Sequence, residues 1–167
     1  KWVHDILLHT FGPRSIGPLE NFIRSDQTIS AAIRTLDKLM PEEELIGLLV
    51  TTLTGYSPED HRTIDARLQL VAALVDHDDD ERSVPATIPY LLDHDDDVRM
   101  KAMDLLQEKV DPKHTLHAEV VDQFVAVMKD PEASGRITRR AADGLIELGA
   151  KLEGRDLDDY IPDGYQL

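Results

Sequence analysis

A helical unit that returns about every 35 residues constrains this chain most strongly. Ile29, Ile64, Val98 and Ile137 each open an apolar helix directly after an acidic or polar turn, at separations of 35, 34 and 39 residues. A period of this length is typical of helix pairs that cannot bury their apolar faces alone and therefore stack on their neighbours. The repeat therefore predicts a fold more directly than it predicts a ligand.

The spacing of apolar residues and the turn residues between them predict the individual helices. We expect helices near residues 1–10, 15–24, 27–40, 41–53, 57–75, 84–92, 96–109, 115–129 and 134–150. Ser25-Asp26 is the expected N-cap of the third of these helices, and Ser57 is the expected N-cap of the fifth. No segment alternates between apolar and polar residues for long enough to predict a sheet.

The domain organisation follows from where these helices stop. Residues 1–150 are expected to form one helical repeat domain, and residues 151–167 a C-terminal tail that is extended or packs on a neighbour. The chain begins with Lys1 and continues at once with apolar residues, which indicates a cut into a longer protein. Cysteine is absent, which excludes disulfides and fits a cytoplasmic location.

The charge balance excludes several classes of partner. Eighteen basic residues face 33 acidic ones, a net charge of −15, so nucleic acid and anionic membrane surfaces are disfavoured. No apolar run is long enough for a membrane span. Most of the acidic residues are aspartate, and there are 11 Arg against only 7 Lys. This composition is typical of proteins from salt-loving organisms, and an ordinary acidic cytosolic protein is the alternative that stays open.

The unit at residues 84–109 carries a recognisable order of residue types. Pro89 stands within the first helix, Asp93 and Asp95 occupy the turn, and Val98-Arg99 opens a second helix that continues with Ala102 and Leu105-Leu106. This order resembles the HEAT repeat, in its PBS-lyase HEAT-like form. Over residues 15–150 the resemblance implies an all-α fold, a right-handed α-α superhelix (HEAT-like solenoid) of about four helix pairs.

Two acidic turns, Asp76–Glu81 and Asp93–Asp97, contain ligands that divalent cations accept. Neither turn has the glycine of a calcium-binding EF-hand loop. Aspartates that cap the following helices explain both turns without a metal. The His-Asp dipeptides in the chain are not the paired His-Glu motifs that bind iron in the HEAT-repeat enzyme deoxyhypusine hydroxylase. We therefore predict no metal and no cofactor.

The candidate binding residues form a basic column in an otherwise acidic chain. Arg67, Lys101 and Arg140 each follow an anchor residue by three positions, so stacked helices would align them as a ridge that binds an acidic peptide or partner. Local pairing of Lys101 with Asp104 and of Arg140 with Asp143 is the alternative. Arg99 is a fourth candidate binding residue, and we expect it to pair with Asp95 or with a neighbouring turn aspartate in a ladder between units.

These features favour a non-catalytic protein–protein interaction scaffold whose concave face holds a protein or peptide partner. No nucleophile motif and no glycine-rich phosphate loop occurs, so no enzyme activity is expected. The resemblance leaves open an accessory subunit or lyase-like role of the PBS-lyase HEAT-like type, connected with bilin attachment. It also leaves open a DNA-lesion binder, which the negative charge disfavours.

Overall fold

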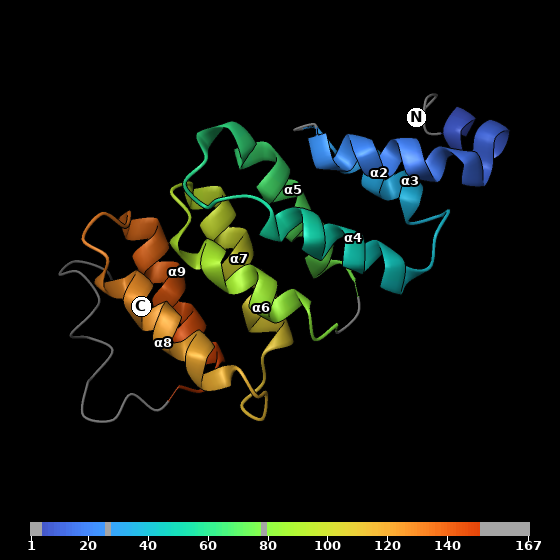
Figure 1. The fold of residues 1–167 in the computed structure, drawn as a ribbon. Helices are drawn as coiled ribbons and strands as arrows, with labels where there is room; N and C mark the ends of the chain where they lie inside the picture. The colour runs from blue at the N-terminus through green and yellow to red at the C-terminus, as the bar shows by residue number, and fades with distance from the viewer. Residues whose placement is uncertain (1–4, 26–27, 78–79, 151–167) are drawn as a thin grey trace.

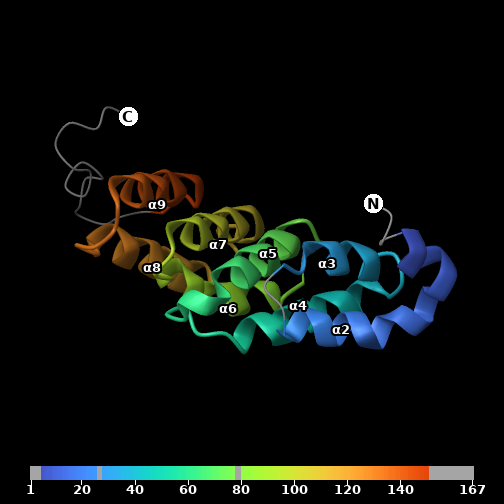
Figure 2. The same ribbon diagram turned by 90° about the horizontal axis from the view of Figure 1, so that it is seen from above.

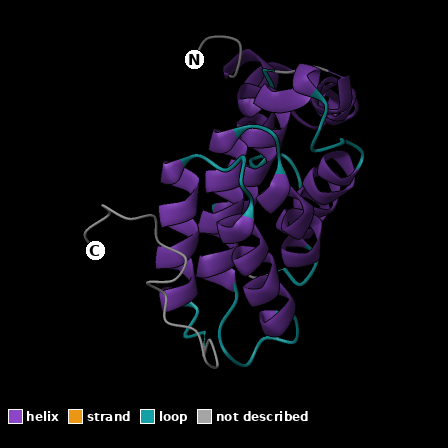
Figure 3. Cartoon of the chain, turned by 90° about the vertical axis from the view of Figure 1, so that its left-hand side faces the viewer, coloured by secondary structure: helices purple, strands orange, loops and turns teal. Residues whose placement is uncertain are grey.

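The structure is a computed structural model that describes residues 5–25, 28–77 and 80–150. All regular structure in these ranges is helical, as expected, and Figure 3 shows helices joined by loops with no strand in the described part of the chain. The expected cap at Asp26 and the expected tail at residues 151–167 lie outside the described residues.

The described elements comprise α-helices and short helical turns. In chain order they are η1 (Leu7–Phe11), η2 (Gly12–Ser15), α2 (Ile16–Ser25), α3 (Ser30–Leu36), α4 (Glu42–Thr54), η3 (His61–Thr63), α5 (Ile64–Val75), α6 (Ser83–Thr87), η4 (Ile88–Leu92), α7 (Asp96–Lys109), α8 (His117–Lys129) and α9 (Gly135–Glu147). Gly12 ends η1 with φ of 51°, a left-handed conformation that glycine adopts without strain.

The helices form two layers along the chain (Figure 2). Each first helix packs on the second helix that follows it, which gives the pairs α2–α3, α4–α5, α6/η4–α7 and α8–α9. The second helices also contact one another in the order α3, α5, α7, α9, and the first helices contact one another from α2 through α4 and α6/η4 to α8. The helix pairs therefore form a row, with α2 and α9 at opposite ends (Figure 1).

The buried faces of the second helices repeat position by position. Leu36, Leu74, Leu106 and Leu145, which are 38, 32 and 39 residues apart, occupy the same place in α3, α5, α7 and α9. In this register Ala66, not Ile64, is the equivalent of Val98 and Ile137. The anchor expected at Ile64 is thus displaced by two residues, because α5 carries a second apolar row, Ala66, Leu70 and Leu74, which is the fully buried one. The anchor expected at Ile29 is displaced by one residue in the same register.

Three expected helices are shorter than their apolar patterns. The helix expected at 27–40 is α3, which ends at Leu36, because the N–H groups of Lys38 and Leu39 bond the carbonyls three residues before them. The helix expected at 57–75 begins only at Ile64, because the Asp60 carboxylate accepts the Arg62 backbone N–H and closes a turn there instead. The segment expected as one helix at 84–92 divides into α6 and the 3₁₀ turn η4. Pro89 lacks the N–H that would continue the α-helix.

Aliphatic side chains fill the space between the two layers. Leu45, Leu49 and Leu53 of α4 are fully buried, as are Leu70 and Leu74 of α5. The same core continues through α7 to α9 without interruption. Each such leucine contributes roughly 1.5–3 kcal/mol by its removal from water. Within the described part of the chain, no helix is long and apolar enough to cross a membrane.

Candidate partner-binding face

The basic column expected from the sequence is not a surface ridge, because Arg67 is fully buried. The corrected register also removes Arg67 from the column, since its equivalent in α7 is Arg99, whereas Lys101 corresponds to Gln69. Arg99 is 6% exposed. Neither guanidinium faces a partner, and of the four residues expected to bind one, only Lys101 and Arg140 reach the surface.

The buried Arg67 guanidinium is held by groups from two consecutive helix pairs. Its Nε and Nη2 donate to the two carboxylate oxygens of Asp93 at 2.7 and 2.9 Å. Its Nη1 donates to the Asp60 carbonyl and to the Thr63 hydroxyl, both at 2.6 Å. Asp93 is also fully buried and accepts the Asp95 N–H, so both charges are compensated inside the core.

Arg99 repeats this arrangement one helix pair further along the chain. Its Nε donates to the Leu91 carbonyl at 3.1 Å, and its Nη2 donates to Asp130 at 3.0 Å. The expected pairing of Arg99 with a neighbouring turn aspartate is therefore confirmed. We call the pairs Arg67–Asp93 and Arg99–Asp130 the arginine ladder. Ile29 and Thr138 occupy the equivalent positions in α3 and α9, so the ladder covers only the middle of the row.

Lys101 and Arg140 lie on the second-helix layer and share one carboxylate. Lys101 Nζ is 3.0 Å from Asp104 Oδ2, and Arg140 Nη2 is 2.9 Å from Asp104 Oδ1. Burial acts to raise the pKa of Asp104, but the hydrogen bonds from Arg140 and Lys101 outweigh it and lower the pKa. The expected Lys101–Asp104 pair is confirmed. The expected Arg140–Asp143 pair is replaced by a contact that bridges α7 and α9.

The second acidic turn caps the helix that follows it, but the first does not: α6 begins after Arg82 without a side-chain cap, and Asp80 accepts the Arg82 N–H instead. Asp95 accepts the N–H groups of Asp97 and Val98 at the start of α7, as expected for an N-cap. Among the described residues, no group of three or more His, Asp or Glu side chains is placed to hold a metal ion. Two residues of the first acidic turn, 78 and 79, lie outside the described part.

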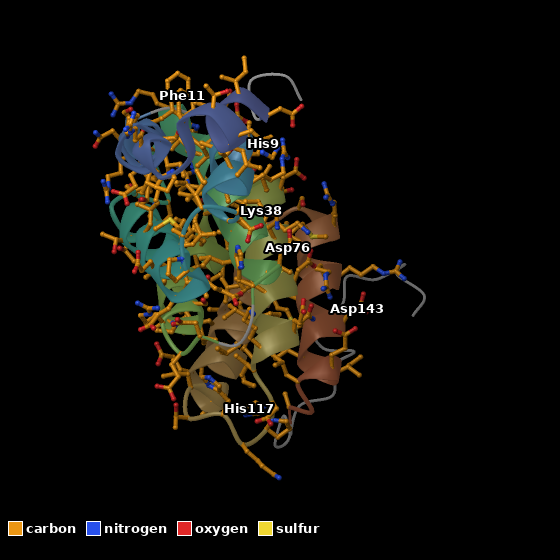
Figure 4. All side chains as sticks on the ribbon, turned by 90° about the vertical axis from the view of Figure 1, so that its right-hand side faces the viewer. His9, Phe11, Lys38, Asp76, His117 and Asp143 are labelled. Carbon is orange, nitrogen blue, oxygen red and sulfur yellow. The ribbon has the colours of Figure 1, made fainter. Side chains whose placement is uncertain are left out.

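A groove of about 390 Å³ opens between α3 and α5 on the second-helix layer. Ile33, Ala72 and Ala73 form its apolar floor, and Ser30 and Gln69 line it where the Gln69 side-chain carbonyl accepts the Ser30 N–H at 2.7 Å. Its charged lining residues are Arg34, Asp37 and Asp76, and the imidazole of His77 also lines it. Asp76, one of these residues, is labelled in Figure 4. A volume of this size falls in the range of ligand pockets, about 300–1,000 Å³.

Small side chains at two register positions explain why the groove lies between α3 and α5 and not between the next two second helices. Ser30 of α3 and Ala73 of α5 both line the groove. At the equivalent positions of the next seam stand Leu68 and Leu105, which pack into the core between α5 and α7. The groove residues were not among those predicted from the sequence. Only the exact alignment of the repeats would have shown that the first seam combines two small residues.

Comparison of this chain with protein-family models, with curated proteins and with solved structures finds no match.

Proposed function

We propose that this chain is a non-catalytic interaction scaffold, a right-handed α-solenoid of HEAT-like helix pairs with a concave partner-binding face. The second helices α3, α5, α7 and α9 would form that face and receive a protein or peptide segment in the cytoplasm. The groove between α3 and α5 is the observation that carries the proposal. It is open, has an apolar floor and carries polar groups at its rim, as binding sites for peptide side chains do.

The buried polar groups support a structural role for the rest of the row. The Arg67 and Asp93 side chains that could have served as reactive groups satisfy one another in the core. Tyr90, another buried polar side chain, donates its hydroxyl to backbone carbonyl groups of the preceding pair. These contacts hold the helix pairs in register, which keeps a binding face rigid and reduces the ordering cost of association.

Peptide selection tests the proposal. Random twelve-residue peptides are selected on the immobilised protein, and the dissociation constants of the selected peptides are measured by fluorescence anisotropy. Ala72→Trp places a large side chain in the groove and is expected to weaken binding at least about tenfold. Ala126→Trp is the matched control, because Ala126 is exposed on α8 in the other layer.

Circular dichroism establishes that both variants keep the helical content of the parent protein. Selected peptides whose affinity is unchanged in Ala72→Trp would contradict binding at the groove. Failure to select any peptide with measurable affinity would contradict the scaffold role itself.

A further inference from the structure

We propose that the α3–α5 groove binds a basic segment of the partner, with one lysine or arginine side chain along its floor. The charged end of that side chain would lie between the carboxylates of Asp37 and Asp76. This inference rests on the proposed scaffold function and specifies the chemistry of the partner. It replaces the acidic partner that the basic column would have required.

The floor of the groove fits the methylene stem of a long cationic side chain. Ile33, Ala72 and Ala73 present apolar surface, and the two alanines leave space above it. Lysine and arginine stems bury their CH₂ groups on such surfaces while the charged end remains hydrated or paired. A shorter or wholly polar side chain would leave this floor in contact with water.

The position of the two carboxylates favours a cation. Asp37 is the C-cap residue of α3, and Asp76 is the C-cap residue of α5. The C-terminal end of a helix such as α5 carries partial negative charge, so a carboxylate there is unfavourable until a cation joins it. Two carboxylates beside such an end create a local field that attracts an ammonium or guanidinium group.

The neighbouring charges leave these carboxylates available. Asp37 pairs with Lys38 at 2.6 Å, but the Lys38 side chain is 63% exposed, and ion pairs of this kind contribute only about 0–1 kcal/mol. Asp76 forms no ion pair with another described residue. Arg34 is the one arginine or lysine in the lining, which therefore has two carboxylates against one guanidinium.

The net charge of the whole chain also favours a basic partner segment. At a net charge of −15 the chain attracts a basic segment and repels an acidic one at long range. Long-range attraction raises the rate of encounter, and the groove then provides the specific contacts. An acidic peptide would have to overcome this repulsion, with Arg34 as the only complementary charge of the groove lining.

The peptides selected for the proposed function provide the first test. Their lysine and arginine content is compared with that of the unselected library, and we expect enrichment. Peptides that bind the groove, as shown by their loss in Ala72→Trp, but are neutral or acidic would overturn this inference while leaving the scaffold function intact.

Paired charge-neutralising variants provide the second test. Asp37→Asn/Asp76→Asn is expected to raise the dissociation constant of a selected basic peptide about tenfold at constant ionic strength. Glu119→Gln/Asp122→Asn removes the same charge from exposed positions of α8 and is expected to change it less than about twofold. An equal loss in both double variants, or no loss in either, would overturn the inference.

Discussion

Tyr90 shows how one side chain can join two helix pairs. It is 2% exposed, and its hydroxyl contacts the carbonyl of Leu53 and, at 2.9 Å, that of Tyr56. Both carbonyls lie at the end of α4, where a helix leaves backbone acceptors without intrahelical partners. Burial raises the pKa of Tyr90 to about 12 from its ordinary value of 10.0. The phenol is thus held in its neutral form by the fold.

The raised pKa of Tyr90 predicts a loss of stability at alkaline pH. Between pH 10 and pH 12 the native state keeps a proton that the unfolded state has released, so the free energy of unfolding falls as the pH rises through this window. Below about pH 10 this contribution is constant. Tyr90→Phe should lower the stability at pH 7 by about 1–3 kcal/mol, because both carbonyls lose the buried hydroxyl donor and only that of Leu53 keeps a backbone N–H.

Urea unfolding of both proteins at several pH values between 7 and 12 measures the effect. The stability of Tyr90→Phe should decline less steeply above pH 10 than that of the parent protein. Parallel curves would show that Tyr90 does not titrate abnormally.

The burial and the pairing of single side chains were harder to predict from the sequence than the helices or their order. The sequence predicted that Arg99 would bind a turn aspartate, because the two residue types recur at fixed places in the repeat. It could not predict that Arg67 is buried, since arginine is rarely placed in a core and its partner Asp93 lies 26 residues away. The contact of Arg140 with Asp104 required the distance between α7 and α9, which periodicity does not supply.

At the level of elements, α9 packs closely on its neighbours through Gly144. A Cβ atom at this position would lie 2.3 Å from Phe124 Cε1 and 2.3 Å from Gln107 Nε2. Glycine in a helix interior costs about 0.5–1 kcal/mol relative to alanine. Close contact of α9 with α7 and α8 compensates for that cost, because Phe124 fills the space that a side chain would occupy.

Gly144→Ala is therefore expected to destabilise the protein by about 1–3 kcal/mol, in spite of the higher helix propensity of alanine. Gly17→Ala in α2 is the matched control, because a Cβ atom there would meet no described atom within 4 Å. The control should be neutral or more stable by up to about 1 kcal/mol. Thermal and urea unfolding report both values, and equal effects of the two substitutions would contradict close packing at Gly144.

Helix boundaries were predictable where caps and periodicity agree. The helix at 96–109 was predicted with its observed bounds, because Asp95 caps it and Asp111-Pro112 follows its end. The start of α5 was not, because Ser57 and Pro58 form a convincing capping sequence that the turn at Asp60 overrides. The two-residue error at Ile64 has a different origin, since α5 carries two apolar rows and only the row with Ala66, Leu70 and Leu74 is fully buried.

The whole molecule carries a large excess of negative charge, and its stability should depend on salt. Mutual repulsion among acidic groups opposes the compact state, and about 1 M salt shortens the screening length to roughly 3 Å. We expect the melting temperature to rise steadily from low salt to about 2 M KCl. Sucrose at matched osmolality is the control for general solute effects. A melting temperature that KCl leaves unchanged would contradict the salt-adapted composition proposed from the sequence.

The arrangement of the pairs was predictable from the order of helices, because each unit needs a neighbour to cover its apolar face. The position of the groove was not predictable, because it depends on which small residues line the contact between α3 and α5. Ser30 and Ala73 come from different units, 43 residues apart, and neither is unusual within its own helix. To predict a groove between two repeats, the repeats must be aligned residue by residue, whereas a period of about 35 residues is enough to detect them.

The arginine ladder also determines how a chain of this kind could be lengthened or shortened. Each buried guanidinium belongs to one helix pair and its carboxylate to the next, so an excision that separates them leaves a lone charge in the interior, at about 3–5 kcal/mol. A duplicated helix pair avoids this only if it supplies one arginine and one aspartate at the positions that they occupy in the arginine ladder. The segment that can be added or removed is therefore defined by the positions of its buried arginine and aspartate as much as by its helix boundaries.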